Sequence, residues 1–246
     1  MNTFIELIRR LKQNPHVLAL IEYGSAHYTD DFKTGDYDLF VIVEGLSTEI
    51  ESLHFHVNGI PVDLNVRDID TLSKQESLTG FEAALLDGRT IFDRHGEIGP
   101  LLESIKREVQ KPYTHHDVAF CRHGHRHVLD KVQGRLESDP VLCKLLLNAN
   151  IGWLIQSYFG IRGLPYRGEK DALNYLKSRE PAIIDAIGRF YAAPFSEQVE
   201  ITIQLSELML RPVGGVWQNG EILAFGETAG ENLQTEGKKL FERLFT

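Results

Sequence analysis

Three aspartates and a Gly-Ser pair are the residues whose types and spacing could do chemistry together. Gly24 and Ser25 close one apolar run, Asp36 and Asp38 open the next, and Asp63 stands inside a third. Side chains alternate between the faces of a strand, so Asp36 and Asp38 point the same way. Converging carboxylates form the hard oxygen cage that Mg²⁺ prefers, completed by water and phosphate oxygens. This pattern is typical of two-metal phosphoryl transfer from a nucleoside triphosphate.

Three strands would have to hold these residues. Apolar runs predict strands at 18–23 and 36–43. Within 54–66, the Asn-Gly pair at 58–59 has the positive-φ preference of a two-residue hairpin turn, so a further strand follows it. Alternate apolar residues give that strand one buried face and leave Asp63 on the other. The sequence therefore predicts that the carboxylates converge from neighbouring strands.

The order of a strand, Gly-Ser, a spacer, Asp-x-Asp and a later strand aspartate resembles the DNA polymerase β-like nucleotidyltransferase superfamily. The resemblance implies that Gly24 and Ser25 hold the terminal phosphates of ATP or another nucleoside triphosphate. It also implies that Asp36 and Asp38 bind two Mg²⁺ ions, with Mn²⁺ as a substitute. Asp63 would complete the metal site beside the acceptor hydroxyl and could accept its proton. All three aspartates are thus expected to be metal ligands and catalytic residues.

The resemblance covers residues 17–66 and departs from the family pattern at two points. Gly35 stands where the family often has a serine before the first aspartate, and Lys33 is the cation that the spacer offers. Both departures bear on phosphate binding more than on metal binding. Further along, the Leu-Asp-Gly-Arg segment at 86–89 is similar to antibiotic-modifying nucleotidyltransferases. The two-part plan of the chain resembles their kanamycin-type and streptomycin-type members.

The chain is expected to be an α+β protein with two domains. Residues 1–112 would form a nucleotidyltransferase domain, a mixed sheet with flanking helices, and residues 113–246 a helical-bundle domain that binds the substrate. A capping box of Thr3 and Glu6 predicts an opening helix that ends before Pro15. The further elements expected are a helix at 72–86, a strand at 89–93, a helix near 100–110, and helices at 114–136, 140–161, 168–178, 181–192, 195–210 and 231–245.

The resemblance further implies that the helical domain supplies one wall of the acceptor site. The segment 158–170 carries aromatic side chains that could stack on a ring, two arginines, and a Glu-Lys pair that opens a helix. Lys170 is the expected contact of the triphosphate, because a compact ammonium suits phosphate. Tyr166 and Glu169 are expected on the acceptor side, with Glu169 as the reserve general base. The alternative for the Glu-Lys pair is a solvent-exposed helix start.

The net charge limits the partners of the chain. Its 246 residues include 35 acidic and 26 basic ones, which gives a formal charge of −9 at pH 7. That charge disfavours a polymerase or another protein that neutralises many phosphates, so nucleic acid is not an expected partner. The densest cationic stretch, residues 122–127, is expected to be a solvated helix face.

The cysteines and histidines suggest no further cofactor. Cys121 and Cys143 are too few for a disulfide framework, and no apolar run reaches the length of a membrane span. A soluble cytoplasmic protein with reduced thiols and no membrane contact is therefore expected. His123 and His127 are one helical turn apart, but no third ligand accompanies them in the pattern, so a zinc site is not expected.

The function expected from these features is Mg²⁺-dependent nucleotidyl transfer. A nucleoside monophosphate would pass from a triphosphate to a hydroxyl of a small-molecule or protein acceptor, with release of pyrophosphate. The alternative is a non-catalytic or regulatory interaction module of the same fold, of the toxin-antitoxin type. Intact Gly-Ser and aspartate motifs favour the enzyme. The identity of the acceptor, the preferred triphosphate and the oligomeric state are left open.

Overall fold

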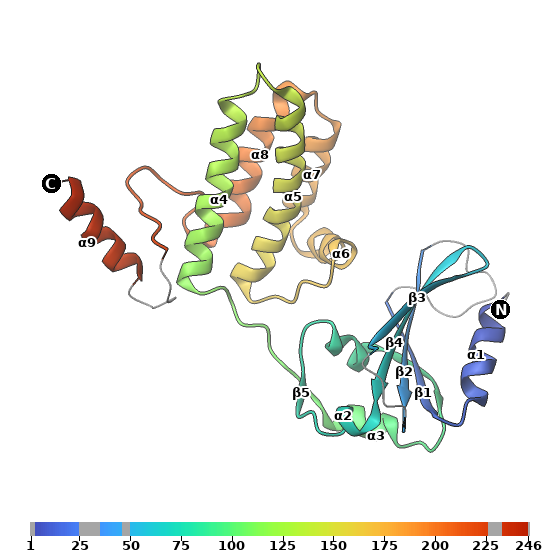
Figure 1. Ribbon diagram of the computed structural model, residues 1–246. Coiled ribbons are helices and arrows are strands. Elements are labelled where there is room, and N and C mark those ends of the chain that lie inside the picture. Colours follow the sequence, from blue (N-terminus) through green and yellow to red (C-terminus); the bar gives the residue numbers. More distant parts are fainter. Residues whose placement is uncertain (1–2, 25–34, 46–49, 226–232, 246) are drawn as a thin grey trace. The chain divides into compact units, whose positions relative to one another are not determined.

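The computed structural model describes residues 3–24, 35–45, 50–225 and 233–245. The chain divides into two compact units, Met1–Val109 and Gln110–Thr246 (Figure 1). The first unit contains a mixed β-sheet with helices on both faces, and the second is helical. The α+β architecture expected from the sequence, a mixed sheet with flanking helices followed by a helical bundle, is confirmed.

The first unit is built on a five-stranded sheet. Its strands are β1 (Val17–Tyr23), β2 (Tyr37–Val43), β3 (Ser52–Val57), β4 (Ile60–Asp68) and β6 (Arg89–Asp93). Their spatial order is β3-β4-β2-β1-β6 (Figure 1). β2 and β4 run parallel, and the other neighbouring pairs are antiparallel. The central position of β2 and the parallel pairing with β4 decide where the acidic residues meet.

Both faces of the sheet carry a hydrophobic core. On one face, α1 (Phe4–Gln13) contributes buried residues such as Leu7, which pack with Leu39 and its alternate neighbours in β2. On the other face, Phe40 and its alternate neighbours belong to a second core. The elements covering that face are α2 (Ile69–Leu72), the 3₁₀ helix η1 (Glu82–Asp87) and α3 (Ile98–Ser104). Burial on both faces explains the nearly continuous apolar sequence of β2.

A two-residue turn joins β3 to β4, as the sequence predicts. Asn58 and Gly59 have φ angles of 52° and 79°. A type I′ turn needs this left-handed conformation at both positions, which asparagine and glycine adopt readily. Pairing outward from the turn places His54 directly opposite Asp63. The turn therefore sets the register of the strand that carries the third aspartate.

The helix expected at 72–86 is wrong. A helix forms earlier, as α2, because the Asp68 carboxylate accepts hydrogen bonds from two backbone N–H groups at its start, at 3.0 and 3.1 Å. A short strand, β5 (Ser77–Leu78), follows, and Gly80 with a φ of 55° precedes η1. The apolar residues of this stretch still reach the core, but from three short elements rather than one helix.

The helix expected near 100–110 begins earlier and is shorter. α3 starts where the Asp93 carboxylate accepts hydrogen bonds from the backbone N–H groups of Ile98 (3.0 Å) and Gly99 (3.3 Å). The chain then forms β7 (Lys106–Arg107), which pairs in parallel with β5. Two residues carry no readable strand pattern, so pairing with a distant segment decides this element. The strand expected at 89–93 is confirmed as β6.

The helices expected in the second unit are confirmed. They are α4 (His115–Gln133), α5 (Pro140–Arg162), α6 (Glu169–Arg179), α7 (Pro181–Ala192), α8 (Phe195–Leu210) and α9 (Leu233–Phe245), with a 3₁₀ turn η2 (Arg211–Val213) after α8. Local signals set several ends. Thr114 and Asp117 form a capping box at α4, the Asp139 carboxylate caps α5, and Gly163 ends α5 with a φ of 63°.

Two further features concern the expected reduced thiols and the expected lack of a membrane span. Cys121 and Cys143 are both free and both buried. Within the part of the chain that the structure describes, no helix combines the length and the apolar character needed to cross a bilayer.

Candidate active site

Three aspartates come together where β2 begins, beside the middle of β4. Parallel pairing of these strands places Asp38 directly beside Asp63. Asp36 precedes β2 by one residue and belongs to the same face as Asp38. One carboxylate oxygen from each residue lies within 4.8 Å of the other two. The structure thus brings the three side chains together, and their catalytic roles stay predictions.

The chemistry of this cluster suits Mg²⁺. Its donors are carboxylate oxygens, the hard ligands that Mg²⁺ selects. Asp36 is exposed, while Asp38 and Asp63 are partly buried, so the cluster is open on one side to further ligands such as phosphate and water. Three negative charges this close repel one another, and a divalent cation relieves that repulsion. Among the described residues, no other group of His, Cys, Asp and Glu side chains meets the same distance criterion.

A glycine directly after β1 lies against this cluster. Gly24 has a φ of 75°, and a Cβ built on it would lie 2.2 Å from Oδ2 of Asp38. A side chain at this position would strain the backbone and would force the Asp38 carboxylate to shift. The absence of a side chain thus lets the backbone at Gly24 lie close to the Asp38 carboxylate. The prediction for Ser25 falls outside the described residues.

Tyr23 and Asn65 border the cluster and were not found from the sequence. Tyr23 lies opposite Asp38 across the β1–β2 pair, and the side-chain amide of Asn65 donates a hydrogen bond of 2.7 Å to the Tyr23 hydroxyl oxygen. Burial raises the pKa of Tyr23, and the negative charges of Asp38 and Asp63 raise it further. The hydroxyl therefore stays protonated and remains a donor beside the carboxylates.

His54 is a second residue that sequence reasoning missed. Its Nδ1 lies 2.6 Å from Oδ1 of Asp63, and its Nε2 lies 3.1 Å from the hydroxyl oxygen of Ser52. The side chains of His54 and Asp63 are 64% and 36% exposed. A signal for His54 was present in the sequence, because counting outward from the Asn-Gly turn pairs it with Asp63.

The reverse face of the sheet anchors the strand that carries the aspartates. Tyr37 stands between Asp36 and Asp38 and points to that reverse face, where its hydroxyl donates a hydrogen bond of 2.6 Å to the buried Glu22 carboxylate. Arg89 pairs with the same carboxylate at 2.6 Å. Because Glu22 binds both the Tyr37 hydroxyl and Arg89, these contacts on the reverse face of the sheet hold the start of β2 in place.

Tyr166, Glu169 and Lys170 lie in the second unit. Glu169 begins α6, Lys170 follows it, and both side chains are exposed. The Tyr166 ring packs edge-on against Phe159, with 5.9 Å between centroids. Burial raises the pKa of Tyr166, whose hydroxyl lies near Gln156 and Glu169 without a hydrogen bond of regular geometry. The roles expected for these residues toward triphosphate and acceptor stay predictions.

The stretch 122–127 is not the solvated face that its charges suggest. His125 is fully buried, with Nδ1 at 2.7 Å from the Asn150 side-chain oxygen and Nε2 at 3.0 Å from the Ser157 hydroxyl. Burial lowers the pKa of His125 to about 4, against a smaller upward effect of the Asn150 contact. The rings of His123 and His127 stack at 6.0 Å.

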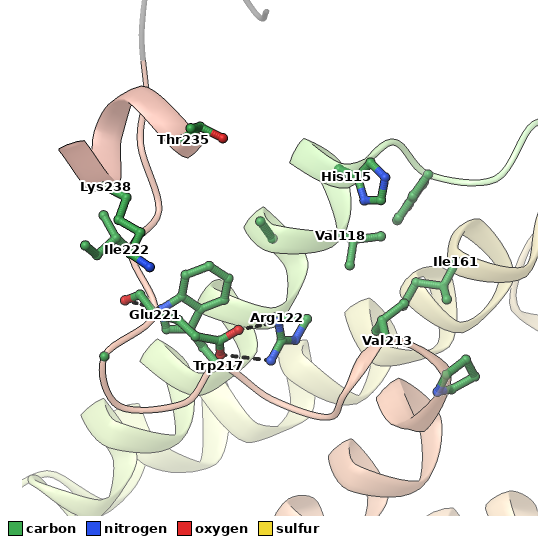
Figure 2. Close-up of a pocket in the computed structure, with 14 residues that line it drawn as sticks. His115, Val118, Arg122, Ile161, Val213, Trp217, Glu221, Ile222, Thr235 and Lys238 are labelled. Atoms are coloured by element: carbon green, nitrogen blue, oxygen red, sulfur yellow. Dashed lines mark hydrogen bonds and ion pairs between the residues drawn. The ribbon is translucent and has the colours of Figure 1, made fainter. Parts of the chain in front are cut away.

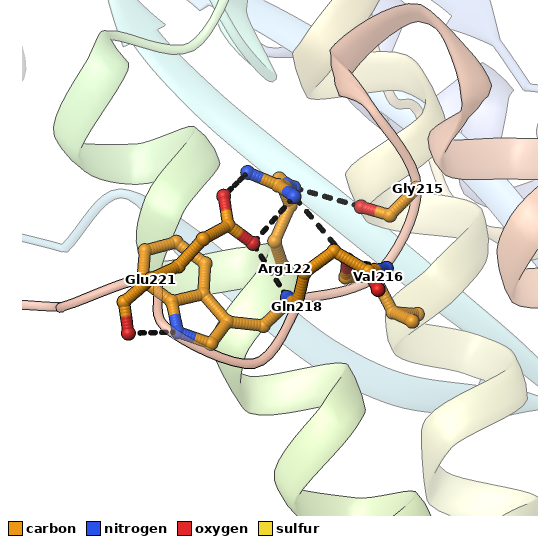
Figure 3. Close-up of polar contacts among 6 residues, drawn as sticks. Arg122, Gly215, Val216, Gln218 and Glu221 are labelled. Atoms are coloured by element: carbon orange, nitrogen blue, oxygen red, sulfur yellow. Dashed lines mark hydrogen bonds and ion pairs between the residues drawn. The ribbon is translucent and has the colours of Figure 1, made fainter.

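Arg122 is also committed to the fold. It donates to the backbone oxygens of Gly215 (2.8 Å) and Val216 (3.2 Å) and to both oxygens of Glu221 (2.7 and 2.9 Å), as Figure 3 shows. Its guanidinium also lies 5.3 Å from the ring centre of Trp217. Arg122 therefore clamps the segment after η2 onto α4 and offers little to a ligand.

This clamp forms one wall of an open cavity of about 920 Å³ in the second unit (Figure 2). His115 and Val118 of α4 line it from one side, and Ile222 and Lys238 from the C-terminal segment. The lining mixes apolar and polar groups, and its arginine is already paired with Glu221. The cavity has the size of a small-molecule site, but its side chains do not single out one ligand chemistry.

Comparison with known proteins gives a distant structural likeness. The chain is similar to the crystal structure of a nucleotidyltransferase-like protein from Exiguobacterium sibiricum 255-15, with a TM-score of 0.40 and 13% sequence identity, covering 85% of this chain and 73% of that one. No family model matches the chain, and no curated protein matches it. At this TM-score the likeness carries no weight for activity, which has to rest on the residues of the chain.

Proposed function

We propose that the chain is a Mg²⁺-dependent nucleotidyltransferase, which moves a nucleoside monophosphate from a triphosphate to a hydroxyl group and releases pyrophosphate. One observation carries the proposal: Asp36, Asp38 and Asp63 offer carboxylate oxygens within 4.8 Å of one another. Phosphoryl transfer asks little covalent work of protein side chains and depends on positioning and charge neutralisation. Three carboxylates gathered on two neighbouring parallel strands, where β2 begins, would supply ligands for a pair of metal ions.

The reaction exchanges one phosphorus–oxygen bond for another. The acceptor oxygen bonds to the α-phosphorus, the bond from that phosphorus to the bridging oxygen of the β-phosphate breaks, and pyrophosphate leaves. When bound, Mg²⁺ supplies positive charge to the phosphates during this step. The acceptor proton passes to a base, for which Asp63 is the candidate in the cluster and Glu169 the reserve.

The donor side of the proposal rests on the turn after β1. Gly24 lacks the side chain that would collide with Asp38, which leaves room for the backbone to approach phosphate oxygens beside the cluster. Ser25 and Lys170 are proposed as further phosphate contacts. ATP is the first triphosphate to test, followed by the other three common ribonucleoside triphosphates.

The acceptor side is proposed from chemistry alone. A hydroxyl on a small molecule or on a protein fits a chain whose formal charge is −9 better than a polynucleotide does. Tyr166 and Glu169 are proposed as acceptor contacts. Polyhydroxylated amines of the aminoglycoside type are suitable first acceptors, because an acidic protein attracts them.

The test asks which bond of the triphosphate breaks. Triphosphates labelled at the α-phosphorus are incubated with the full chain and Mg²⁺, with candidate acceptors or with water as the acceptor. The proposal expects labelled monophosphate or labelled acceptor together with pyrophosphate. Release of diphosphate and inorganic phosphate would contradict it. Nucleotide binding without turnover would favour the non-catalytic alternative.

Asp36→Asn and Asp38→Asn should each lower this activity at least 100-fold, because each removes a metal ligand and a negative charge from the cluster. Neither should lower the melting temperature, since relief of carboxylate repulsion offsets lost contacts. Asp70→Asn is the matched control, because Asp70 is an exposed aspartate of the same unit outside the cluster. Activity above about a tenth of wild type in either cluster variant would count against two-metal catalysis.

A further inference from the structure

A chain of two hydrogen bonds leads away from the acidic cluster along β3. His54 Nδ1 lies 2.6 Å from Oδ1 of Asp63, and His54 Nε2 lies 3.1 Å from the Ser52 hydroxyl oxygen. Ser52 and His54 are two residues apart on one strand and so share a face, and the β3–β4 register puts that face beside Asp63. The proposed chemistry uses neither Ser52 nor His54.

The donor and acceptor roles in this chain follow from the groups themselves. An ionised carboxylate only accepts hydrogen bonds, so the ring nitrogen facing Asp63 has to carry the proton. In a neutral imidazole the other nitrogen is then an acceptor, and the Ser52 hydroxyl donates to it. Asp63 thus sets the ring tautomer of His54, and Ser52 hydrogen-bonds the other ring nitrogen and helps to hold the ring in place.

The contact leaves the rest of the Asp63 carboxylate to the cluster. With Oδ1 accepting from His54, Oδ2 and the remaining lone-pair directions of Oδ1 can face a metal ion. Without the contact, Asp63 would rotate more freely, because its side chain is 36% exposed. Outer hydrogen bonds of this kind fix the direction of metal ligands, and their loss typically weakens metal binding about 10- to 100-fold.

We propose that His54, held by Ser52, is a positioning residue that orients the Asp63 carboxylate toward the metal ions. This inference rests on the proposed function, since it takes the acidic cluster to be a metal site. His54 acts through Asp63 and need not touch the triphosphate.

The neighbouring histidine on the same strand provides a matched control. His56 is exposed like His54 and, two residues further on, shares its face, but it lies opposite Pro61 rather than an aspartate. Within the described part of the chain no hydrogen bond joins His56 to a carboxylate. A change at His56 therefore reproduces the loss of an exposed strand histidine without touching Asp63.

The experiment measures binding of Mn²⁺ alone to the full chain, by loss of the electron paramagnetic resonance signal of the free ion. His54→Ala should raise the Mn²⁺ dissociation constant about 10- to 100-fold, and Asp63→Asn at least as much. His54→Asn should retain affinity within about threefold, because its side-chain amide places a donor where Nδ1 stands. Ser52→Ala should have a smaller effect than His54→Ala, and His56→Ala none.

The possible results separate this inference from the proposed function. Equal Mn²⁺ affinity in wild type and His54→Ala would overturn the role of His54 while leaving the metal site intact. Tighter binding by His54→Ala would also overturn it and make the histidine a competitor of the metal. Absence of Mn²⁺ binding by the wild type would instead remove the metal site, and the inference with it. Melting curves of each variant verify that an affinity change is not unfolding.

Discussion

Gly24 is the residue on which the shape of the acidic cluster depends most directly. Its φ of 75° and the 2.2 Å between a built Cβ and Oδ2 of Asp38 are separate constraints. The first concerns the backbone, which any side chain strains in the left-handed region. The second concerns the carboxylate, which would have to move. Beside a larger residue at position 24, the Asp38 carboxylate would have to shift from the position it holds in the cluster.

Substitution of two glycines separates these constraints. Gly24→Ala and Gly59→Ala should each lower the free energy of unfolding by about 1 kcal/mol, because both backbones have positive φ. A Cβ at Gly59 meets nothing within 4 Å. Only Gly24→Ala should weaken Mn²⁺ binding, by at least tenfold. The same Mn²⁺ affinity in both variants would show that Asp38 tolerates the added methyl group.

At this scale the sequence predicted the convergence of the three aspartates better than it predicted the residues around them. Strand alternation was enough to place Asp36, Asp38 and Asp63 on one face. His54 was readable from the hairpin turn, since a two-residue loop fixes every pair beyond it. Tyr23 and Asn65 were not, because their contact joins β1 to β4 across the central strand. Such a contact depends on strand order, which local patterns do not contain.

At the scale of elements, the packing of α4 on α5 contains a buried polar contact. His125 of α4 donates from Nδ1 to the side-chain oxygen of Asn150 and accepts at Nε2 from the hydroxyl of Ser157, both on α5. The centre of its ring lies 4.1 Å from that of Trp153. Gly124, beside it, permits this approach, because a Cβ there would lie 2.0 Å from the Trp153 ring. The two helices therefore fit closely in shape, and both ring nitrogens of His125 have a partner, while Nδ2 of Asn150 is buried with no hydrogen-bond partner among the described residues.

The buried histidine makes stability depend on pH. The folded-state pKa of His125 is about 4, below the unfolded value of 6.5, so the unfolded chain binds the proton more strongly. Its contribution is fully present above pH 6.5 and is lost as the pH falls through about 4. The free energy of unfolding should fall by about 2 kcal/mol between pH 8 and pH 5 from this residue.

Urea unfolding of the wild type and of His125→Gln between pH 8 and pH 5 separates the contribution of His125 to the pH dependence of stability from that of the carboxylates. The variant should be less stable at pH 8, because the packing and hydrogen bonds between α4 and α5 are disturbed. Its stability should nevertheless change less between pH 8 and pH 5 than that of the wild type. Parallel curves for the two proteins would mean that His125 titrates normally in the folded state.

The Arg122 clamp is the second feature at the scale of elements. Its contacts hold residues 215–221, which have no regular secondary structure, against α4. Arg122→Met keeps the length of the side chain but removes four hydrogen bonds to this segment. Amide hydrogen exchange at 215–221 should speed up about 10- to 100-fold, while exchange in α5 stays unchanged.

Arg126→Met is the control for that prediction, because Arg126 forms an exposed pair with Asp130 one turn along the same helix. It should leave exchange at 215–221 as in the wild type. Equal exchange in the two variants would mean that Trp217 and the backbone, rather than the arginine, hold the segment.

Elements with strong local signals were the ones that the sequence predicted. The helices of the second unit have side-chain or glycine caps at several ends, and their apolar spacing is long enough to read. The segment 72–86 has apolar spacing as well, but Asp68 starts a helix before it and Gly80 interrupts it. β5 exists because it pairs with β7, a partner far along the chain. Tertiary pairing of this kind overrides a weak helical preference.

At the scale of the whole molecule, net charge is the property that limits which classes of acceptor the chain can bind. The formal charge is −9, and two bound divalent ions would add four charges and leave the chain at about −5. The stretch that looked most cationic offers little to an external anion: Arg122 pairs with Glu221, Arg126 pairs with Asp130, and His125 is buried with a lowered pKa. This stretch therefore presents less positive charge than its sequence suggests.

Nucleic acid should consequently bind weakly. Non-specific binding at physiological salt has dissociation constants of about 10⁻⁴ to 10⁻⁶ M in proteins that neutralise many phosphates. We expect no binding of a fluorescent single-stranded RNA or of a DNA duplex at about 100 μM protein and 150 mM salt, with or without Mg²⁺. Binding that appears at low salt and disappears with a steep salt dependence would reveal a basic track on the folded chain. In that case the acceptor hydroxyl would have to be sought on a polynucleotide rather than on a small molecule or a protein.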